Sequence, residues 1–291
     1  MASSADSPAR PAVEMRCAQC KKMVKELELV NMNRCTACKV VHYCTPDCQK
    51  TNWKIHKPAC VASASSKPYI LHIDFNRATS DDAPWCKPLL DSMTIPHSRT
   101  YALATSPSQA SAILDHPIPP AAILCTSGEI VDDKCADIRT KLRICVENGA
   151  RLVLGGPIAN FLHLGRLDSA FTDFGASWKY MGYHRTTHSL NVAHPLYASL
   201  PGHSPARGAL PSSYSCKSVF LKDVPADEAV YLTDRNAQYE GLVPMPGAEV
   251  TTGEVAVAAK KVGEGWFAWV GDVNQEQGST TATLFLLGLK Q

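Results

Sequence analysis

The sequence predicts two structural units: a small cysteine-rich domain at residues 16–60 and a larger α/β domain at residues 68–291. Seven of the 12 cysteines lie between Cys17 and Cys60, and the other five are scattered over the rest of the chain. Beyond residue 68, strand-like apolar runs alternate with helix-like patterns. This alternation indicates a parallel or mixed sheet that is covered by helices on both faces.

Short polar segments flank the cysteine-rich domain. Residues 1–15 are rich in Ala, Ser and Pro and contain no apolar core, so we expect a disordered tail and not a signal peptide. Residues 61–67 are small and polar, which predicts a flexible linker. No apolar run approaches the roughly 18 residues of a membrane helix. We therefore expect an intracellular protein, in the nucleus or the cytoplasm, that does not bind a membrane.

The cysteine-rich domain contains eight soft or borderline metal ligands in four closely spaced pairs, Cys17-x2-Cys20, Cys35-x2-Cys38, Cys44-x3-Cys48 and His56-x3-Cys60. Zn²⁺ prefers four thiolate or imidazole ligands in a tetrahedron, so eight ligands fit two closed structural sites. A disulfide framework explains the pattern less well, because a reducing compartment is expected for a chain without a secretory signal. The sequence therefore predicts two zinc ions.

The helix that follows Cys44 restricts how the pairs can share the two ions. Thr45 and Pro46 form a helix start, and the helix should continue through His56. Cys48 and His56 would then lie about 12 Å apart along the helix axis, whereas two ligands of one zinc lie only about 4 Å apart. If the helix is continuous, these two residues bind different ions, which favours an interleaved, cross-braced arrangement.

The ligand pattern, together with Tyr43, Gln49 and Trp53, resembles a MYND-type zinc finger over about 44 residues. The resemblance implies two zinc sites, the first formed by Cys17, Cys20, Cys44 and Cys48 and the second by Cys35, Cys38, His56 and Cys60. It also implies that the finger binds proline-containing segments of other proteins beside Gln49 and Trp53. Alternatively, Trp53 only packs inside this small domain. Nucleic acid is a disfavoured partner, because the finger has only a slight positive excess once its thiolates are counted.

In the larger domain, strands are expected where short runs are apolar and β-branched, at residues 69–75, 99–104, 121–125, 151–154, 218–222, 229–232, 255–260 and 266–270. Helices are expected at residues 132–148 and 280–289. The domain resembles the class I glutamine amidotransferase-like superfamily near its ThuA-like branch, through Leu154-Gly155-Gly156, residues 194–201, and residues 255–260 with 263–271. That resemblance implies a flavodoxin-like three-layer sandwich with a mixed, mostly parallel sheet.

No catalytic residue is predicted for this domain. The segment that corresponds to the nucleophile elbow of the amidotransferases is Gly155-Gly156-Pro157, which has no thiol. Cys125 ends a strand but has no local base, and a buried structural role is commoner for such a cysteine. His184 and His188 would share the face of a helix, which by itself is weak support for a metal or acid–base site. The chain also lacks the Asn-His-Ser-Cys type of run found in SET methyltransferases that contain a MYND finger.

The sequence thus favours a zinc-binding adaptor with a non-catalytic amidotransferase-like domain. The alternative is a hydrolase or amidotransferase-like enzyme that the finger only targets. Such an enzyme would need Cys125 or another nucleophile within hydrogen-bond reach of a histidine, in a pocket at the carboxyl ends of the strands.

Overall fold

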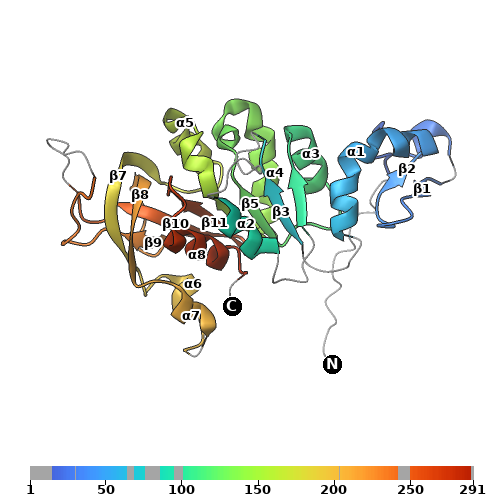
Figure 1. Cartoon of the computed structure of the whole chain (residues 1–291). Coiled ribbons are helices and arrows are strands. Elements are labelled where there is room, and N and C mark those ends of the chain that lie inside the picture. The colour runs from blue at the N-terminus through green and yellow to red at the C-terminus, as the bar shows by residue number, and fades with distance from the viewer. Residues whose placement is uncertain are drawn as a thin grey trace, which may run out of the picture.

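The computed structural model describes residues 15–29, 31–63, 69–75, 86–94, 101–202, 204–241 and 250–289. The zinc finger lies at one end of the molecule, and the sheet of the α/β domain extends away from it (Figure 1). Apart from Met15, the tail expected at residues 1–15 lies outside the described residues. The same holds for residues 64–67 of the expected linker.

The finger consists of short elements followed by one long helix. A 3-10 turn, η1 (Lys25–Leu27), precedes the two antiparallel strands β1 (Asn33–Arg34) and β2 (His42–Tyr43). Helix α1 (Pro46–Ser63) begins at the expected position and continues past Pro58. Residues 61–63, which the sequence assigned to the linker, are therefore the last turn of this helix.

Five short strands form the parallel half of the main sheet, in the spatial order β4 (Tyr101–Ala104), β3 (Ile70–Ile73), β5 (Ala122–Cys125), β6 (Arg151–Leu154) and β11 (Gly265–Val270). Strands β3 and β5 are buried along their whole length. Burial on both faces explains why they are continuous apolar runs in the sequence and not alternating patterns.

The rest of the sheet is antiparallel, and its strands are β10 (Val255–Val262), β8 (Ser213–Lys222), β7 (Lys179–Leu190) and β9 (Ala229–Leu232). Strand β9 pairs with both β7 and β10, so these four strands close into a ring. The prediction of a mostly parallel sheet is therefore wrong for this half. The flavodoxin-like arrangement is not confirmed, although the domain is mixed α/β as expected.

The helices cover both faces of the parallel half (Figure 1). One face packs against α3 (Pro107–Leu114), α4 (Ala136–Glu147) and α5 (Leu164–Thr172), and the other against α2 (Lys87–Thr94) and α8 (Gln277–Leu286). The remaining short elements are η3 (Gly128–Val131), η4 (Asp133–Cys135), η5 (Gly156–Asn160), α6 (Pro195–Ala198) and α7 (Pro205–Ala209). Among the described residues, no helix combines the length and apolar character that crossing a bilayer requires.

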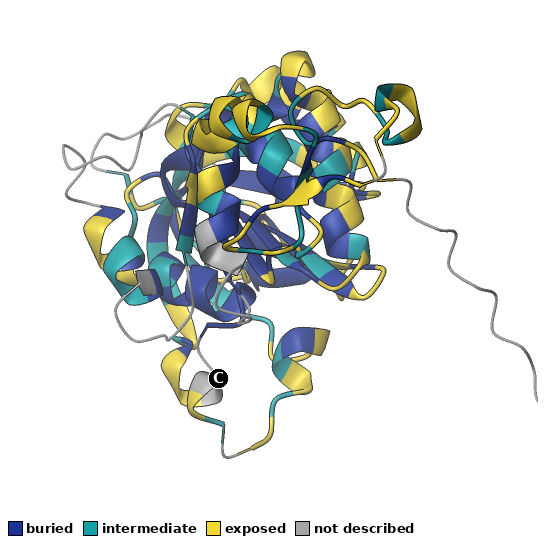
Figure 2. Cartoon of the chain, turned by 90° about the vertical axis from the view of Figure 1, so that its right-hand side faces the viewer, coloured by how far each residue is buried: buried dark blue, intermediate teal, exposed yellow. Residues whose placement is uncertain are grey.

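Helix α1 connects the finger to the α/β domain. It packs against α3 and against β4, the edge strand of the sheet. Its residue Ala59 is 1% exposed and belongs to the main apolar core of the α/β domain. Seen from the finger side, many exposed residues lie in front and the buried sheet lies behind them (Figure 2). The finger is thus packed directly onto the larger domain.

Candidate metal centre

Two tight turns present the first ligand pair of each metal cluster. In the first turn, the backbone N–H of Lys21 donates to the carbonyl oxygen of Cys17 at 2.9 Å, and in the second, Lys39 donates to Cys35 at 2.8 Å. Both lysines have a left-handed backbone, with φ values of 63° and 58°. This conformation is uncommon for a residue with a side chain. Its repetition at the same position after each Cys-x2-Cys pair shows that the two turns use one geometry.

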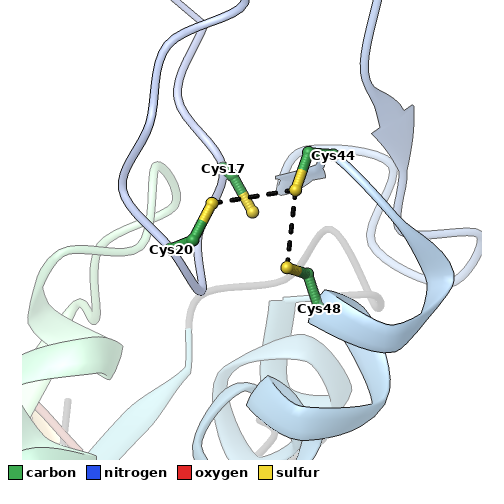
Figure 3. Close-up of side chains that lie close together, drawn as sticks. All are labelled: Cys17, Cys20, Cys44 and Cys48. Carbon is green, nitrogen blue, oxygen red and sulfur yellow. Dashed lines mark hydrogen bonds between the residues drawn. The ribbon is translucent and has the colours of Figure 1, made fainter. Parts of the chain in front are cut away.

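The first cluster contains Cys17, Cys20, Cys44 and Cys48, whose sulfur atoms all lie within 4.8 Å of one another (Figure 3). The sulfur of Cys44 lies 3.7 Å from that of Cys20 and 3.4 Å from that of Cys48. Cys48 is in the first turn of α1, where its backbone N–H donates to the hydroxyl oxygen of Thr45 at 3.1 Å. The expected cap of the helix therefore also positions a ligand.

The second cluster contains Cys35, Cys38, His56 and Cys60, again with ligand atoms within 4.8 Å of one another. The sulfurs of Cys35 and Cys60 are 3.6 Å apart, and the sulfur of Cys38 lies 3.7 Å from Nε2 of His56. Three of these four residues are buried. Helix α1 thus supplies Cys48 to one cluster and His56 and Cys60 to the other, which confirms the interleaved pairing.

The geometry of both clusters fits zinc. With Zn–S bonds of about 2.3 Å, a regular tetrahedron places its sulfurs about 3.8 Å apart. All 12 cysteines are free, so none of these sulfur contacts is a disulfide. Each cluster offers four protein ligands, which is the closed coordination of structural zinc; catalytic zinc keeps an open position for water or substrate. These residues would hold two Zn²⁺ ions.

Within each cluster, ionisation of one thiol disfavours ionisation of a neighbouring thiol. Burial raises the pKa of Cys17, but backbone N–H groups of Cys20 and Cys44 outweigh it and lower the value to about 6. The hydrogen bond with the Cys48 thiol, followed by burial, raises the pKa of Cys44 to about 12. In the other cluster, burial and the Cys35 thiol raise the pKa of Cys60 to about 12. A divalent cation removes this conflict because it stabilises all the thiolates together.

His56 links the second cluster to the α/β domain. Its ring stacks on the ring of His116 with centroids 5.8 Å apart and an interplanar angle of 22°. Burial, with a smaller contribution from His116, lowers the pKa of His56 to about 4. The ring is therefore neutral at physiological pH, which is the form that binds a metal.

The two residues expected to bind a peptide lie on the solvent side of α1. Trp53 is 37% exposed, and Gln49 is half-buried. The apolar core of the finger is formed by Cys17, Met32, Cys35, Tyr43 and Cys60, and does not include Trp53. Trp53 contacts only the edge of the His56 ring among the described aromatic side chains, with centroids 5.9 Å apart.

Cys125, the candidate nucleophile of the alternative hypothesis, is fully buried. Burial raises its pKa to about 12, and its sulfur lies 3.8 Å from the carbonyl oxygen of Ser127. A thiol acts as a nucleophile only as the thiolate, which this environment disfavours. The geometry gives no support to a catalytic role.

A cysteine–histidine contact that the sequence did not reveal lies between β7 and β8. The sulfur of Cys216 is 3.9 Å from Nε2 of His188, and both residues are buried. Burial raises the pKa of Cys216 well above its usual value and lowers that of His188 to about 4, so both groups are neutral. His184 and His188 lie on strand β7, so the prediction that they share a helical face is wrong.

Residues 13–60 match the MYND finger family. The matched segment contains both metal clusters and helix α1 as far as Cys60. It occupies less than a quarter of the chain, so it identifies this domain and not the whole protein.

The similar proteins found by sequence match only a short stretch of this chain. SET domain and MYND-type zinc finger protein 6 of Schizosaccharomyces pombe is 50% identical over 40 residues, which are 14% of this chain and 8% of that protein. Histone-lysine N-methyltransferase ASHR1 of Arabidopsis thaliana is 40% identical over 55 residues, 19% of this chain and 10% of that protein. The chain thus spans about a tenth of the curated relatives that it matches.

The solved structures that align with most of this chain are only 12% identical to it. A ThuA-like protein of Bacteroides uniformis aligns over 77% of this chain and 89% of its own, with 12% identity and a TM-score of 0.47. A β-galactosidase of Halorubrum lacusprofundi aligns over 79% of this chain and 33% of its own, with 12% identity and a TM-score of 0.43. At these TM-scores, no conclusion about topology or activity follows.

Proposed function

We propose that this protein is a zinc-stabilised adaptor whose finger binds proline-containing segments of partner proteins. The supporting observation is the position of Trp53. Its large aromatic side chain stays more than a third exposed, outside the core of the finger, on the helix that carries three zinc ligands. An exposed aromatic ring on a rigid helix is suited to anchor a peptide, and proline-rich segments dock on aromatic surfaces.

The closed coordination of both clusters supports a structural role for zinc. Neither site leaves a position for a substrate, so the metal organises the binding surface and supplies no reaction chemistry. The methyltransferase activity in the name of the Arabidopsis relative is not carried over, because that protein matches this chain over only 55 residues.

For the α/β domain we propose a non-catalytic, amidotransferase-like scaffold. Its parallel strands, numbered along the chain, are ordered second, first, third, fourth and fifth, which is the order of flavodoxin-like sheets. Both thiols considered as nucleophiles, Cys125 and Cys216, are buried and have raised pKa values. We further propose that residues 16–60 and 68–291 act as two functional units inside the cell, in the nucleus or the cytoplasm.

Titration of a fluorescent proline-rich synthetic peptide with the zinc-loaded full chain tests this function. Trp53→Ala should weaken binding by more than about tenfold, since an aromatic anchor contributes about 2 kcal/mol or more. Gln49→Ala should weaken it less. Lys50→Ala, which changes an exposed neighbour on the same helix, is the matched control and should bind as the wild type does. Equal affinity of wild type and Trp53→Ala would refute the proposed site.

A further inference from the structure

A cavity of about 540 Å³ lies at the junction of the finger and the α/β domain. The finger contributes Arg34 and His42 from its two strands and Asn52 and His56 from α1, and the α/β domain contributes His116 and its neighbours at the end of α3. This volume is in the range of specific binding pockets, roughly 300–1,000 Å³. The cavity requires both units, because its walls come from segments separated by about 60 residues of chain.

The cavity adjoins the proposed peptide site. Asn52 and His56 line it, while Gln49 and Trp53 are spaced with them at i, i+3, i+4 and i+7 along α1. Residues with this spacing share one face of a helix. A segment that passes over Trp53 can therefore continue into the cavity without crossing the helix.

Two imidazole nitrogens of the lining residues, Nε2 of His42 and Nε2 of His116, have no hydrogen-bond partner among the described residues. The backbone N–H of Ile118 donates to Nδ1 of His116 at 3.2 Å, while the Ile118 carbonyl is farther from that nitrogen, at 3.4 Å. With the Ile118 N–H as the donor to Nδ1, the neutral ring carries its proton on Nε2. His116 is 6% exposed, and its Nε2 has no hydrogen-bond partner among the described residues. Such a buried donor is costly unless an acceptor reaches it.

The charges around the cavity favour an anion. Its charged lining residues are Arg16, Arg34 and Asp115. The carboxylate of Asp115 is already paired with the ammonium group of Lys141, whereas Arg34 has no ion-pair partner among the described residues. The apolar part of the wall, formed by Val40, Val41 and Pro117, suits the aliphatic portion of an amino-acid side chain.

We propose that this cavity is the second half of the peptide site and receives an acidic side chain next to the proline of the partner segment. Arg34 pairs with the carboxylate, and Nε2 of His116 donates a hydrogen bond to it or to the adjoining peptide carbonyl. The α/β domain would thereby select among the proline-containing segments that Trp53 anchors. This inference rests on the proposed function of the finger.

Two labelled synthetic peptides test the cavity proposal. One has a central Pro-Pro followed by Glu-Glu, and the other has Gln-Gln in place of Glu-Glu. Fluorescence anisotropy with the zinc-loaded full chain should show that the Glu peptide binds about tenfold tighter, because charge-assisted bonds are roughly twice as strong as neutral ones. Arg34→Gln and His116→Phe should each remove most of this difference. Phenylalanine keeps a ring to stack on His56, and native mass spectrometry verifies that both zinc ions remain.

Three controls separate the possible outcomes. Lys50→Gln removes a finger charge outside the cavity and should keep the preference for Glu. Trp53→Ala should weaken both peptides equally, and a loss of that effect refutes the proposed function. Equal binding of the two peptides by the wild type, or a preference that survives Arg34→Gln, overturns only the cavity proposal. A single-stranded oligonucleotide that binds through Arg34 more tightly than the Glu peptide overturns it as well.

Discussion

In the finger, three of the five residues that form its apolar core, Cys17, Cys35 and Cys60, are themselves zinc ligands. In the α/β domain, by contrast, the largest buried side chains are aromatic, among them Trp178, Trp269 and Phe267. A segment of fewer than about 50 residues buries too little apolar surface to fold alone, whereas a domain of about 200 residues does not need a metal. One chain thus combines two sources of stability, metal coordination in the finger and apolar packing in the α/β domain.

Removing zinc should have the largest effect, and this effect should fall on the finger. Structural zinc in small fingers contributes about 10–16 kcal/mol at pH 7, so a strong chelator should unfold the finger completely. Helix α1 also covers β4 and places Ala59 in the core of the α/β domain, so that domain should remain cooperative but melt a few degrees lower. Limited proteolysis and thermal circular dichroism with chelator measure both effects. A finger that stays protected from the protease without metal would contradict this prediction.

Truncating an aromatic side chain of the core tests the stability of the α/β domain. Phe267 is fully buried and stacks on Phe174 with centroids 4.1 Å apart. Phe267→Ala should lower the free energy of unfolding of the α/β domain by about 3–5 kcal/mol, because it leaves a cavity among rigid rings. Urea denaturation measures this loss, and native mass spectrometry should still detect two zinc ions. Release of zinc from this variant would show that the two units are not independent.

Acidification should have a smaller effect. It should change the free energy of unfolding of the α/β domain in opposite directions through His188 and Asp272. Burial lowers the pKa of His188 to about 4, whereas an unfolded histidine titrates near about 6.5. Between these values the unfolded state binds the proton first, so this group destabilises the fold as pH falls. Burial, and then Glu276, raise the pKa of Asp272 to about 7, so Asp272 has the opposite sign and stabilises the fold on acidification.

Urea titrations between about pH 7 and pH 5 can separate the two contributions. His188→Gln should reduce the loss of stability on acidification by about 2 kcal/mol, and Asp272→Asn should increase that loss. The change in the free energy of unfolding with pH is compared between each variant and the wild type, because either substitution can also change the absolute stability. An unchanged slope in both variants would show that these groups titrate normally.

Much of the fold could be predicted where the signal is local. The buried strands β3, β5 and β6 appear in the sequence as short apolar runs close to their observed bounds. Strand β7 was missed because its burial is only partial and its alternating pattern was interpreted as two histidines on a helix. Its partners β8 and β9 lie more than 20 residues further along the chain, and pairing with them stabilises it as a strand.

The sequence by itself determined which eight side chains form the metal clusters and that Cys48 and His56 belong to different clusters, while the full division was what the MYND resemblance implied. Ligand spacing and the stiffness of one helix are local properties, and they separate Cys48 from His56 before any tertiary contact is known. Only the tertiary structure decided that α1 lies on the edge of the sheet, that β9 closes a ring of antiparallel strands, and that His116 stacks on His56. Those arrangements depend on contacts between residues far apart in the chain, which no local pattern encodes.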